Sequence, residues 1–400
     1  MHGGTILRNI GFSYFALALS PIASESSKAY LKKRISFSLV SLFLAITYVV
    51  LLTFTGLLTP FIRLSSISHD VYVQFLLFTF AIGIFFSIIT FPLDYYTDFV
   101  TEHRFKLSNE TFSKWLFRKA KGGLIGSVLG IIMLLIFYFL LIHFPRVWWL
   151  LFAFFFFLFQ IFVAQLFPTI ILPMFYKLKP LSNEALYGRL NGLVEKFGYK
   201  MSGVFSFNLS RETRKANAAL TGLGKSRKII ISDTLLENFS NDEIEVVLAH
   251  ELGHLVKHHM MKGIIVSAIA SLIGFYIMAQ IYSFYADLRG LPVYNLTAIP
   301  FLALLVTVFG LIATPLGNFY SRKIEHEADL FALAATGMRM EFAESMRKLG
   351  KINLTPENPP AWIEKIFFSH PSIGARIRAA LPAGSDDAVH ERSDRGETVS

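Results

Sequence analysis

The segment "VVLAHELGHLVKHHM" spans Val246–Met260, and a long apolar run begins three residues later at Gly263. His250 and His254 are four residues apart, so they share one face of a helix. Two imidazole nitrogens at this spacing can bind one zinc ion, and Glu251 is placed to act as a general base on water. The segment therefore predicts a metal site on a helix that immediately precedes a membrane span.

The residues around this segment favour a buried helix. Ser240 and Glu243 have the spacing of a capping box, and the apolar stretch EVVLA follows them. A surface helix with two solvated histidines is the alternative, and the apolar flank argues against it. His258 extends the four-residue spacing, but it would lie about 6 Å further along the helix axis. We therefore expect His258 and His259 to be polar groups at the helix end.

The composition indicates a membrane protein. Apolar residues make up 54% of the 400 residues and charged residues only 16%, whereas soluble chains carry about 25% charged residues. Six apolar runs reach the length of about 20 residues that a bilayer crossing needs. They are roughly Ile35–Leu58, Val71–Leu93, Leu124–Phe144, Val147–Leu172, Gly263–Tyr285 and Ala298–Leu316. A further segment, Ile6–Leu19, is either a seventh span or an interfacial segment.

Charge gives the orientation. The formal net charge is +10, and the Lys and Arg residues cluster beside alternate apolar runs, which is the pattern of a membrane protein rather than of a nucleic-acid-binding protein. The positive-inside rule places the N-terminus, the region Tyr176–Lys262 and the C-terminal region in the cytoplasm. The chain has no cysteine, so any metal must take histidine and carboxylate ligands.

A carboxylate for the metal follows the last apolar run, in "SRKIEHEADLFALAATG". The two preceding runs form a membrane hairpin that returns this segment to the level of the HELGH helix. Spacing alone permits Glu325 or Glu327 as the third ligand. On a helix, Glu325 shares a face with Asp329, which can orient a ligating imidazole, whereas Glu327 falls on the face of Lys323, where an exposed ion pair would explain it. The helical faces therefore favour Glu325.

The segment between the fourth and fifth runs is soluble in character. Asn183–Phe197 has helical periodicity, "GVFSFNL" and "KIIIS" predict strands, and "ANAALTGLGKSRKIII" predicts a hairpin that turns at Gly222–Gly224. The expected organisation is an N-terminal membrane domain, a catalytic region with HELGH, a membrane hairpin, a C-terminal catalytic region and a disordered tail, at residues 1–175, 176–262, 263–320, 321–383 and 384–400.

Several motifs together resemble the type I CAAX prenyl protease family of integral-membrane zinc metalloproteases. They are, in the order of the argument, HELGH, EHEAD, SHPSIGARI, ANAAL, DYYTDFVTEHRFKLSNET and FPTIILPMFYKLKPL. The resemblance covers roughly Lys28 to Leu381. It implies a mainly α fold, in which a polytopic helical membrane barrel of six or seven spans carries a cytoplasm-facing, gluzincin-type zinc-protease domain with a small β-sheet.

The resemblance also implies roles for single residues. One zinc ion per chain would be held by His250, His254 and Glu325, with Glu251 as the base. His370 and Arg376 would stabilise the transition state or bind the substrate backbone. Asn217 and Ala218 would bind the substrate backbone from an edge strand.

We therefore expect a zinc metalloendopeptidase that cleaves peptide or protein substrates in an intramembrane chamber, as enzymes that process C-terminal CAAX motifs do. The alternatives are a quality-control protease of membrane proteins without prenylated substrates, and an inactive scaffold or chaperone. Membrane lipid is an expected partner and nucleic acid is not. The expected location is the inner membrane of a bacterium or the endoplasmic reticulum of a eukaryote. Sequence leaves the oligomeric state open.

Overall fold

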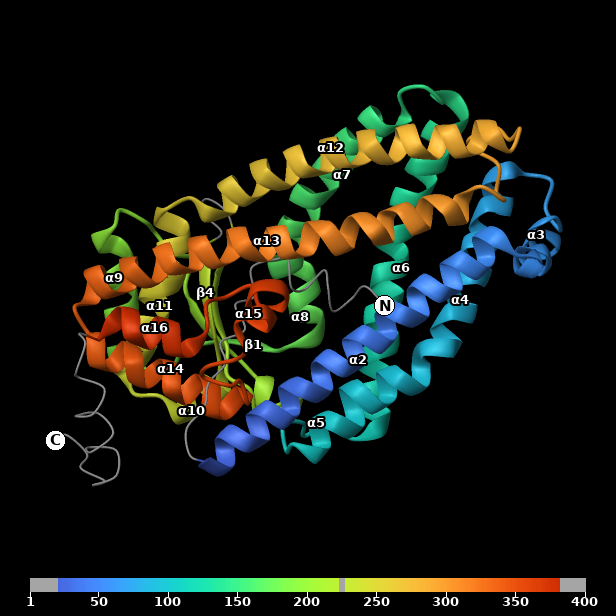
Figure 1. Ribbon diagram of the computed structural model, residues 1–400. Helices are drawn as coiled ribbons and strands as arrows, with labels where there is room; N and C mark the ends of the chain where they lie inside the picture. Colours follow the sequence, from blue (N-terminus) through green and yellow to red (C-terminus); the bar gives the residue numbers. More distant parts are fainter. Residues whose placement is uncertain (1–20, 223–226, 382–400) are drawn as a thin grey trace.

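Six long helices dominate the computed structural model, which describes residues 21–222 and 227–381 (Figure 1). All six are long and apolar enough to cross a membrane, which confirms the six expected spans. They are α2 (Pro21–Phe54), α4 (Val71–Tyr95) continued by η2 (Tyr96–Val100) and α5 (Thr101–Arg104), α6 (Phe112–His143), α7 (Trp148–Leu166) continued by η3 (Phe167–Ile171) and α8 (Leu172–Phe175), α12 (His259–Leu288) and α13 (Ile299–Thr336). The segment Ile6–Leu19 and the tail 384–400 lie outside the described residues.

The first span ends earlier than the expected Leu58. Helix α2 stops at Phe54, and the extended backbone of Thr55 caps the short 3₁₀-helix η1 (Gly56–Leu58), which leads into α3 (Thr59–Ser65). The Thr55 side chain accepts a hydrogen bond from the backbone N–H of Leu57, so the cap itself separates the two helices.

The membrane helices form a closed ring. In order, α2 contacts α4, α4 contacts α6, α6 contacts α7, α7 contacts α12, α12 contacts α13, and α13 returns to α2. This is the expected helical barrel. Because α12 and α13 are consecutive and antiparallel (Figure 1), the start of α12 and the end of α13 lie at the same end of the ring.

The soluble region contains a four-stranded sheet in the order β1-β2-β4-β3. The strands are β1 (Leu178–Pro180), β2 (Val204–Phe207), β3 (Ala218–Thr221) and β4 (Lys228–Ser232). Strands β3 and β4 pair antiparallel, as the predicted hairpin requires, although residues 223–226 of its turn are not described. Strand β2 pairs parallel to β4, and β3 is left at the edge of the sheet.

Helices and the sheet share one apolar core in the soluble region. The helices of the soluble region are α9 (Glu184–Lys196), η4 (Leu209–Arg211), α10 (Asp233–Asn238), α11 (Asn241–Val256), α14 (Arg339–Asn353), α15 (Ala361–Phe367) and α16 (Ile373–Ala380). The predicted capping box of α11 is present, because Ser240 and Glu243 each satisfy the other's backbone N–H. This cap sets where the metal-site helix begins.

Helices α11 and α13 approach each other very closely at Gly253. A Cβ atom added there would lie 3.1 Å from the Cα atom of Ala328 and 3.1 Å from the ring of Phe331. Ala328 and Ala332 are fully buried on the facing side of α13. Small residues on both helices therefore allow the two backbones to meet.

The DYYTDFVTEHRFKLSNET motif attaches the membrane helices to the segment before β3. Ser108 forms an antiparallel bridge with Thr213. The backbone oxygen of Leu107 accepts hydrogen bonds from the Arg214 N–H at 3.0 Å and the Thr213 hydroxyl at 2.7 Å. Lys215 lies 2.9 Å from the Glu102 carboxylate at the end of the second span. The entry to the edge strand is thus fixed to the membrane domain.

We predict opposite effects of two glycine-to-alanine changes on stability. Gly263 has open space around its Cα, so Gly263→Ala should stabilise α12 by about 0.5–1 kcal/mol through helix propensity. At Gly253 the new methyl group meets backbone atoms, and overpacking of this kind costs about 1–3 kcal/mol. Thermal unfolding in one detergent should therefore show a higher midpoint for Gly263→Ala and a lower midpoint for Gly253→Ala. Equal midpoints would contradict the close approach.

Candidate metal centre

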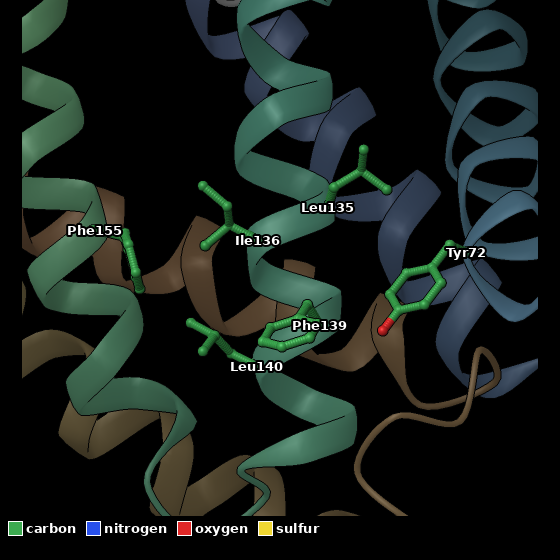
Figure 2. Close-up of a pocket in the computed structure, with 6 residues that line it drawn as sticks. All are labelled: Tyr72, Leu135, Ile136, Phe139, Leu140 and Phe155. Carbon is green, nitrogen blue, oxygen red and sulfur yellow. The ribbon is translucent and has the colours of Figure 1, made fainter.

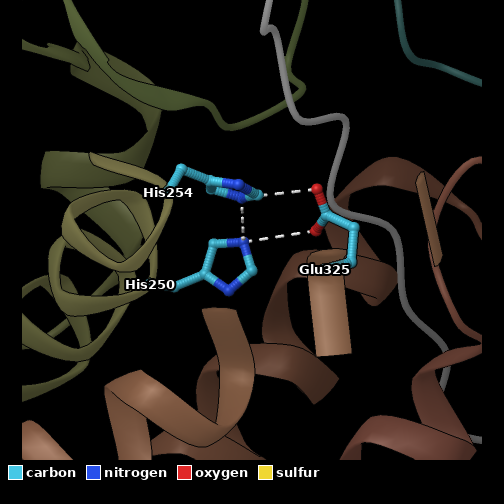
Figure 3. A group of neighbouring side chains, drawn as sticks. All are labelled: His250, His254 and Glu325. Carbon is cyan, nitrogen blue, oxygen red and sulfur yellow. Dashed lines mark hydrogen bonds and ion pairs between the residues drawn. The ribbon is translucent and has the colours of Figure 1, made fainter. Parts of the chain in front are cut away.

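Three side chains from two helices converge at the contact of α11 and α13 (Figure 3). The Nε2 atoms of His250 and His254 lie 3.2 Å apart. The Glu325 carboxylate places Oε2 at 3.3 Å from His250 Nε2 and Oε1 at 3.4 Å from His254 Nε2. His250 and Glu325 are buried, and His254 is partly exposed.

These distances fit a zinc ion. Bonds of about 2.0–2.1 Å in a tetrahedral arrangement separate neighbouring ligand atoms by about 3.3 Å. Two imidazoles and one carboxylate are a ligand set of catalytic zinc sites, in which a fourth position takes water or substrate. The three residues that the sequence proposed as ligands are thus brought together by the fold.

A buried ion pair supports His250 from behind. Its Nδ1 lies 2.8 Å from Asp329 Oδ1, which is where helical spacing places a partner for a ligating imidazole. The Arg376 guanidinium donates to both oxygens of Asp329, at 2.8 Å from Nε and at a shorter distance from its terminal nitrogen. Burial lowers the pKa of His250, but Asp329 and Glu325 outweigh burial and raise this pKa to about 9. The surroundings of His250 therefore favour positive charge between the carboxylates.

The carboxyl group of Glu251 is buried beside the proposed ligand His250. Its side chain is 6% exposed, and Oε1 has no hydrogen-bond partner within the described part of the chain. Burial raises the pKa of this carboxyl group, while the neighbouring His250 acts in the opposite direction. A carboxylate that is desolvated and unpaired binds a proton more readily than one in water.

His370 and Arg376 occupy different positions around the centre. His370 Nδ1 lies 2.8 Å from Glu325 Oε2, on the side where the His370 side chain is 20% exposed. Arg376 is 3% exposed and contacts Asp329 and His250 Nδ1. This differs from the expectation that both residues face substrate, because helix α16 directs the guanidinium to the rear of His250.

Asn217 and Ala218 lie at the start of the edge strand β3. The Asn217 N–H donates to Ser232 Oγ at 2.9 Å, and its carbonyl accepts from the Ser232 N–H at 2.8 Å. Ala218 follows opposite Ile231. Helix α11 contacts β3, so the strand and the metal-site helix are neighbours. The backbone of β3 is paired with β4 on one side of the strand.

His259 and Glu327 are parts of the centre that sequence reasoning missed. His259 is 2% exposed, and its Nδ1 lies 3.0 Å from His254 Nδ1. The other nitrogen, Nε2, lies 3.2 Å from Glu327 Oε2. Glu327 therefore pairs with His259, and its nearest lysine is Lys262, at 3.8 Å, rather than the expected Lys323. The sequence does contain a histidine five residues after His254. It can contact His254 only if the helix is interrupted between them, and the sequence pattern did not indicate that interruption.

Two family models match consecutive parts of the chain. The model described as peptidase family M48 matches residues 180–382. The model described as the CAAX prenyl protease N-terminal region, with five membrane helices, matches residues 13–177. The chain belongs to peptidase family M48. As a member of this family it is a metalloendopeptidase, and its six apolar helices make it a multi-pass membrane protein.

Individual relatives agree with M48 membership. An uncharacterized metalloprotease, YhfN of Bacillus subtilis, is 28% identical over 76% of this chain and 72% of its own length. CAAX prenyl protease 1 of Saccharomyces cerevisiae is 28% identical over 73% of this chain and 69% of its own length. The crystal structure of Ste24p from S. mikatae superposes with a TM-score of 0.80 and 25% identity, over 91% of this chain and 89% of that chain. These comparisons confirm the resemblance and the fold.

An apolar pocket on the membrane helices is a separate feature (Figure 2). Its volume is about 340 Å³, and its lining residues are Tyr72, Leu135, Ile136, Phe139, Leu140 and Phe155. Tyr72 is the second residue of α4, whereas the other end of that span reaches the soluble region. The pocket thus lies toward the opposite end of the membrane helices from the metal centre, and its side chains offer no base for hydrolysis.

We predict that Glu325→Ala loses bound metal, because the carboxylate supplies both oxygens that face the histidine pair. Its neighbour His326 is exposed and serves as a matched control on the same helix turn. Metal content per chain, measured by elemental analysis after purification, should fall strongly in Glu325→Ala and stay unchanged in His326→Ala. Full metal content in Glu325→Ala would remove Glu325 from the ligand set.

Proposed function

We propose that this M48 member is a zinc metalloendopeptidase with its active site at the cytoplasmic end of the membrane ring. The observation that carries the proposal is the arrangement of His250, His254 and Glu325 at zinc-ligand separations, with Glu251 on the same helix. The support for one zinc ion per chain is this single cluster among the described residues, in a chain without cysteine.

In this proposal, each residue of the centre has a separate role in the hydrolysis of a peptide bond. A zinc ion held by His250, His254 and Glu325 would supply Lewis acidity, which lowers the pKa of a coordinated water to about 7 and polarises a carbonyl group. Glu251 accepts the proton of the attacking water and passes it to the leaving amine. His370, on the partly exposed side of Glu325, donates a hydrogen bond to the oxygen on which negative charge develops. Arg376 and Asp329 hold His250 in place.

The edge strand provides the substrate-binding element. An extended peptide can add to the outer side of β3 by main-chain hydrogen bonds, which supply affinity without requiring one particular sequence. Asn217 and Ala218 stand at the beginning of this strand, and β3 contacts the helix that carries His250. Substrate backbone laid along β3 is thereby directed toward the metal centre.

The arrangement of the membrane helices bears on the place where substrate is cleaved. The closed order of helix contacts supports an intramembrane chamber that has the metal centre at one end. The relatives named CAAX prenyl protease 1 support C-terminal CAAX segments of prenylated proteins as the substrate class. The alternation of basic loops supports a cytoplasmic position of the centre, at the inner membrane of a bacterium or the endoplasmic reticulum of a eukaryote.

We predict that Glu251→Gln retains zinc and lowers turnover by about 10²–10⁴-fold, because the amide has nearly the same shape but cannot accept a proton. Zinc content and peptide cleavage should be measured on the same preparation. Near-normal turnover at full zinc occupancy would show that another group is the base.

We predict that Asn217→Ala raises KM and lowers kcat/KM while zinc content stays normal, since the change affects the start of the substrate strand and not the ligands. Asn191→Ala is the control, because Asn191 bonds locally to Glu195 on α9. The substrate-strand role fails if both variants show the same KM across several peptides.

The function itself is tested with a prenylated CAAX peptide and its unprenylated twin. We expect the purified protein to cleave the prenylated peptide faster, 1,10-phenanthroline to abolish cleavage, and added zinc to restore it. Equal rates on both peptides would favour the quality-control alternative. Cleavage that persists in protein shown to be metal-free would contradict the zinc mechanism.

A further inference from the structure

The two candidate histidine ligands are supported in different ways. His250 Nδ1 faces the fully buried Asp329 carboxylate, which Arg376 holds. Among the residues that the structure describes, no carboxylate pairs with His254 Nδ1, which instead lies 3.0 Å from the Nδ1 of a second imidazole, His259. The second nitrogen of a ligating histidine normally donates its proton to an acceptor that fixes the ring orientation. The acceptor for His254 is therefore His259.

A break in the helix makes this contact. Residues five apart point about 140° away from each other on a continuous helix, so they do not meet. Here α11 ends at Val256, and His258 adopts a left-handed backbone with φ of 55° before α12 starts at His259. This turn carries the His259 imidazole back onto His254 and buries it to 2% exposure.

The hydrogen-bond pattern determines where the protons lie. His254 Nε2 faces His250 and Glu325, so in a neutral ligating imidazole the proton is on Nδ1. That proton is donated to His259 Nδ1, which must then be unprotonated. The His259 proton is consequently on Nε2, where it is donated to Glu327 Oε2 at 3.2 Å. Each nitrogen in this series of hydrogen bonds is thus either a donor or an acceptor, and the Glu327 carboxylate is the final acceptor.

We propose that His259 and Glu327 are positioning residues that orient His254 for zinc. The proposal rests on the metal site of the proposed function and extends it by a series of hydrogen bonds, from His254 to His259 on α12 and from His259 to Glu327 on α13. We call this series the relay. The relay joins the beginning of the membrane hairpin to its end, since His259 is the first residue of α12 and Glu327 follows Glu325 on α13. Zinc affinity thereby depends on the correct pairing of these two membrane helices.

The variants are chosen to separate the relay from the general stability of the helices. His259→Leu removes the imidazole that accepts from His254, and Glu327→Ala removes the carboxylate that accepts from His259. Lys323→Ala is the matched control, because Lys323 lies one turn before Glu327 and is exposed. Glu327 also lies 3.8 Å from Lys262 Nζ, so Lys262→Ala is a second control. If Glu327 acted through that ion pair, Lys262→Ala would reproduce its effect. Zinc affinity and the rate of zinc loss to a competing chelator are the readouts, with thermal unfolding of the zinc-free proteins as a check of folding.

We expect His259→Leu and Glu327→Ala each to weaken zinc affinity by about 10–100-fold, as the loss of a group behind a ligating histidine does. Lys323→Ala and Lys262→Ala should bind zinc like the unmodified protein. Glu327→Gln should recover part of the loss, because its amide oxygen can still accept the His259 proton. Unchanged zinc affinity in Glu327→Ala and His259→Leu would overturn the proposal.

A double variant tests whether the two residues act in series. Once His259→Leu has broken the relay, Glu327→Ala should add no further loss, whereas independent effects would add. His259→Asn gives a second test, because its side-chain oxygen can replace Nδ1 as the acceptor but cannot reach Glu327. We expect it to bind zinc more tightly than His259→Leu and to be insensitive to Glu327→Ala. Additive losses would overturn the relay.

The failure of this proposal and of the metal site give different results. If Glu325→Ala abolishes zinc binding while His259→Leu and Glu327→Ala do not change it, the metal site stands and the relay is wrong. If Glu325→Ala binds zinc normally, the metal site itself is wrong, and the relay fails with it.

Discussion

The backbone contact between α11 and α13 at Gly253 and Ala328 is the constraint on which the rest of the structure depends. Metal ligation requires atoms about 3.3 Å apart, and helices separated by large side chains have axes 8–10 Å apart or more. Gly253 has no side chain, and a Cβ atom there would lie only 3.1 Å from the Cα atom of Ala328. Its absence lets Glu325 reach a pair of histidines on another helix. The same approach buries Asp329 and Glu251, which gives both carboxylates a low-dielectric environment.

The membrane ring makes this contact possible. Helices α12 and α13 leave and return at the same end because each crosses the membrane once, so the proposed ligands on either side of the hairpin meet without a long loop. Charged contacts extend the arrangement to the substrate strand. Glu102, at the end of the second span, holds Lys215 at 2.9 Å, only two residues before Asn217. Membrane helices thus position both the proposed metal ligands and the strand proposed to bind substrate.

Much of this arrangement was predictable because periodicity records which residues share a face. The shared face of His250 and His254 and that of Glu325 and Asp329 follow from 3.6 residues per turn. The return of Glu325 to the level of the histidines follows from the two apolar runs that precede it. The same rule failed for Glu327 and His259, since a left-handed residue at His258 interrupts the helix and periodicity does not extend across it. Burial of Arg376 also escaped prediction, because spacing from His370 does not specify which face of α16 meets Asp329.

Anomalous X-ray diffraction from crystals of the purified, active protein at the zinc edge tests the central claim most directly. The account predicts one strong peak per chain, within bonding distance of His250 Nε2, His254 Nε2 and the Glu325 carboxylate, with His259 and Glu327 outside that distance. A principal peak ligated by His259 or Glu327, or the absence of a peak at the α11–α13 contact in active protein, would contradict it.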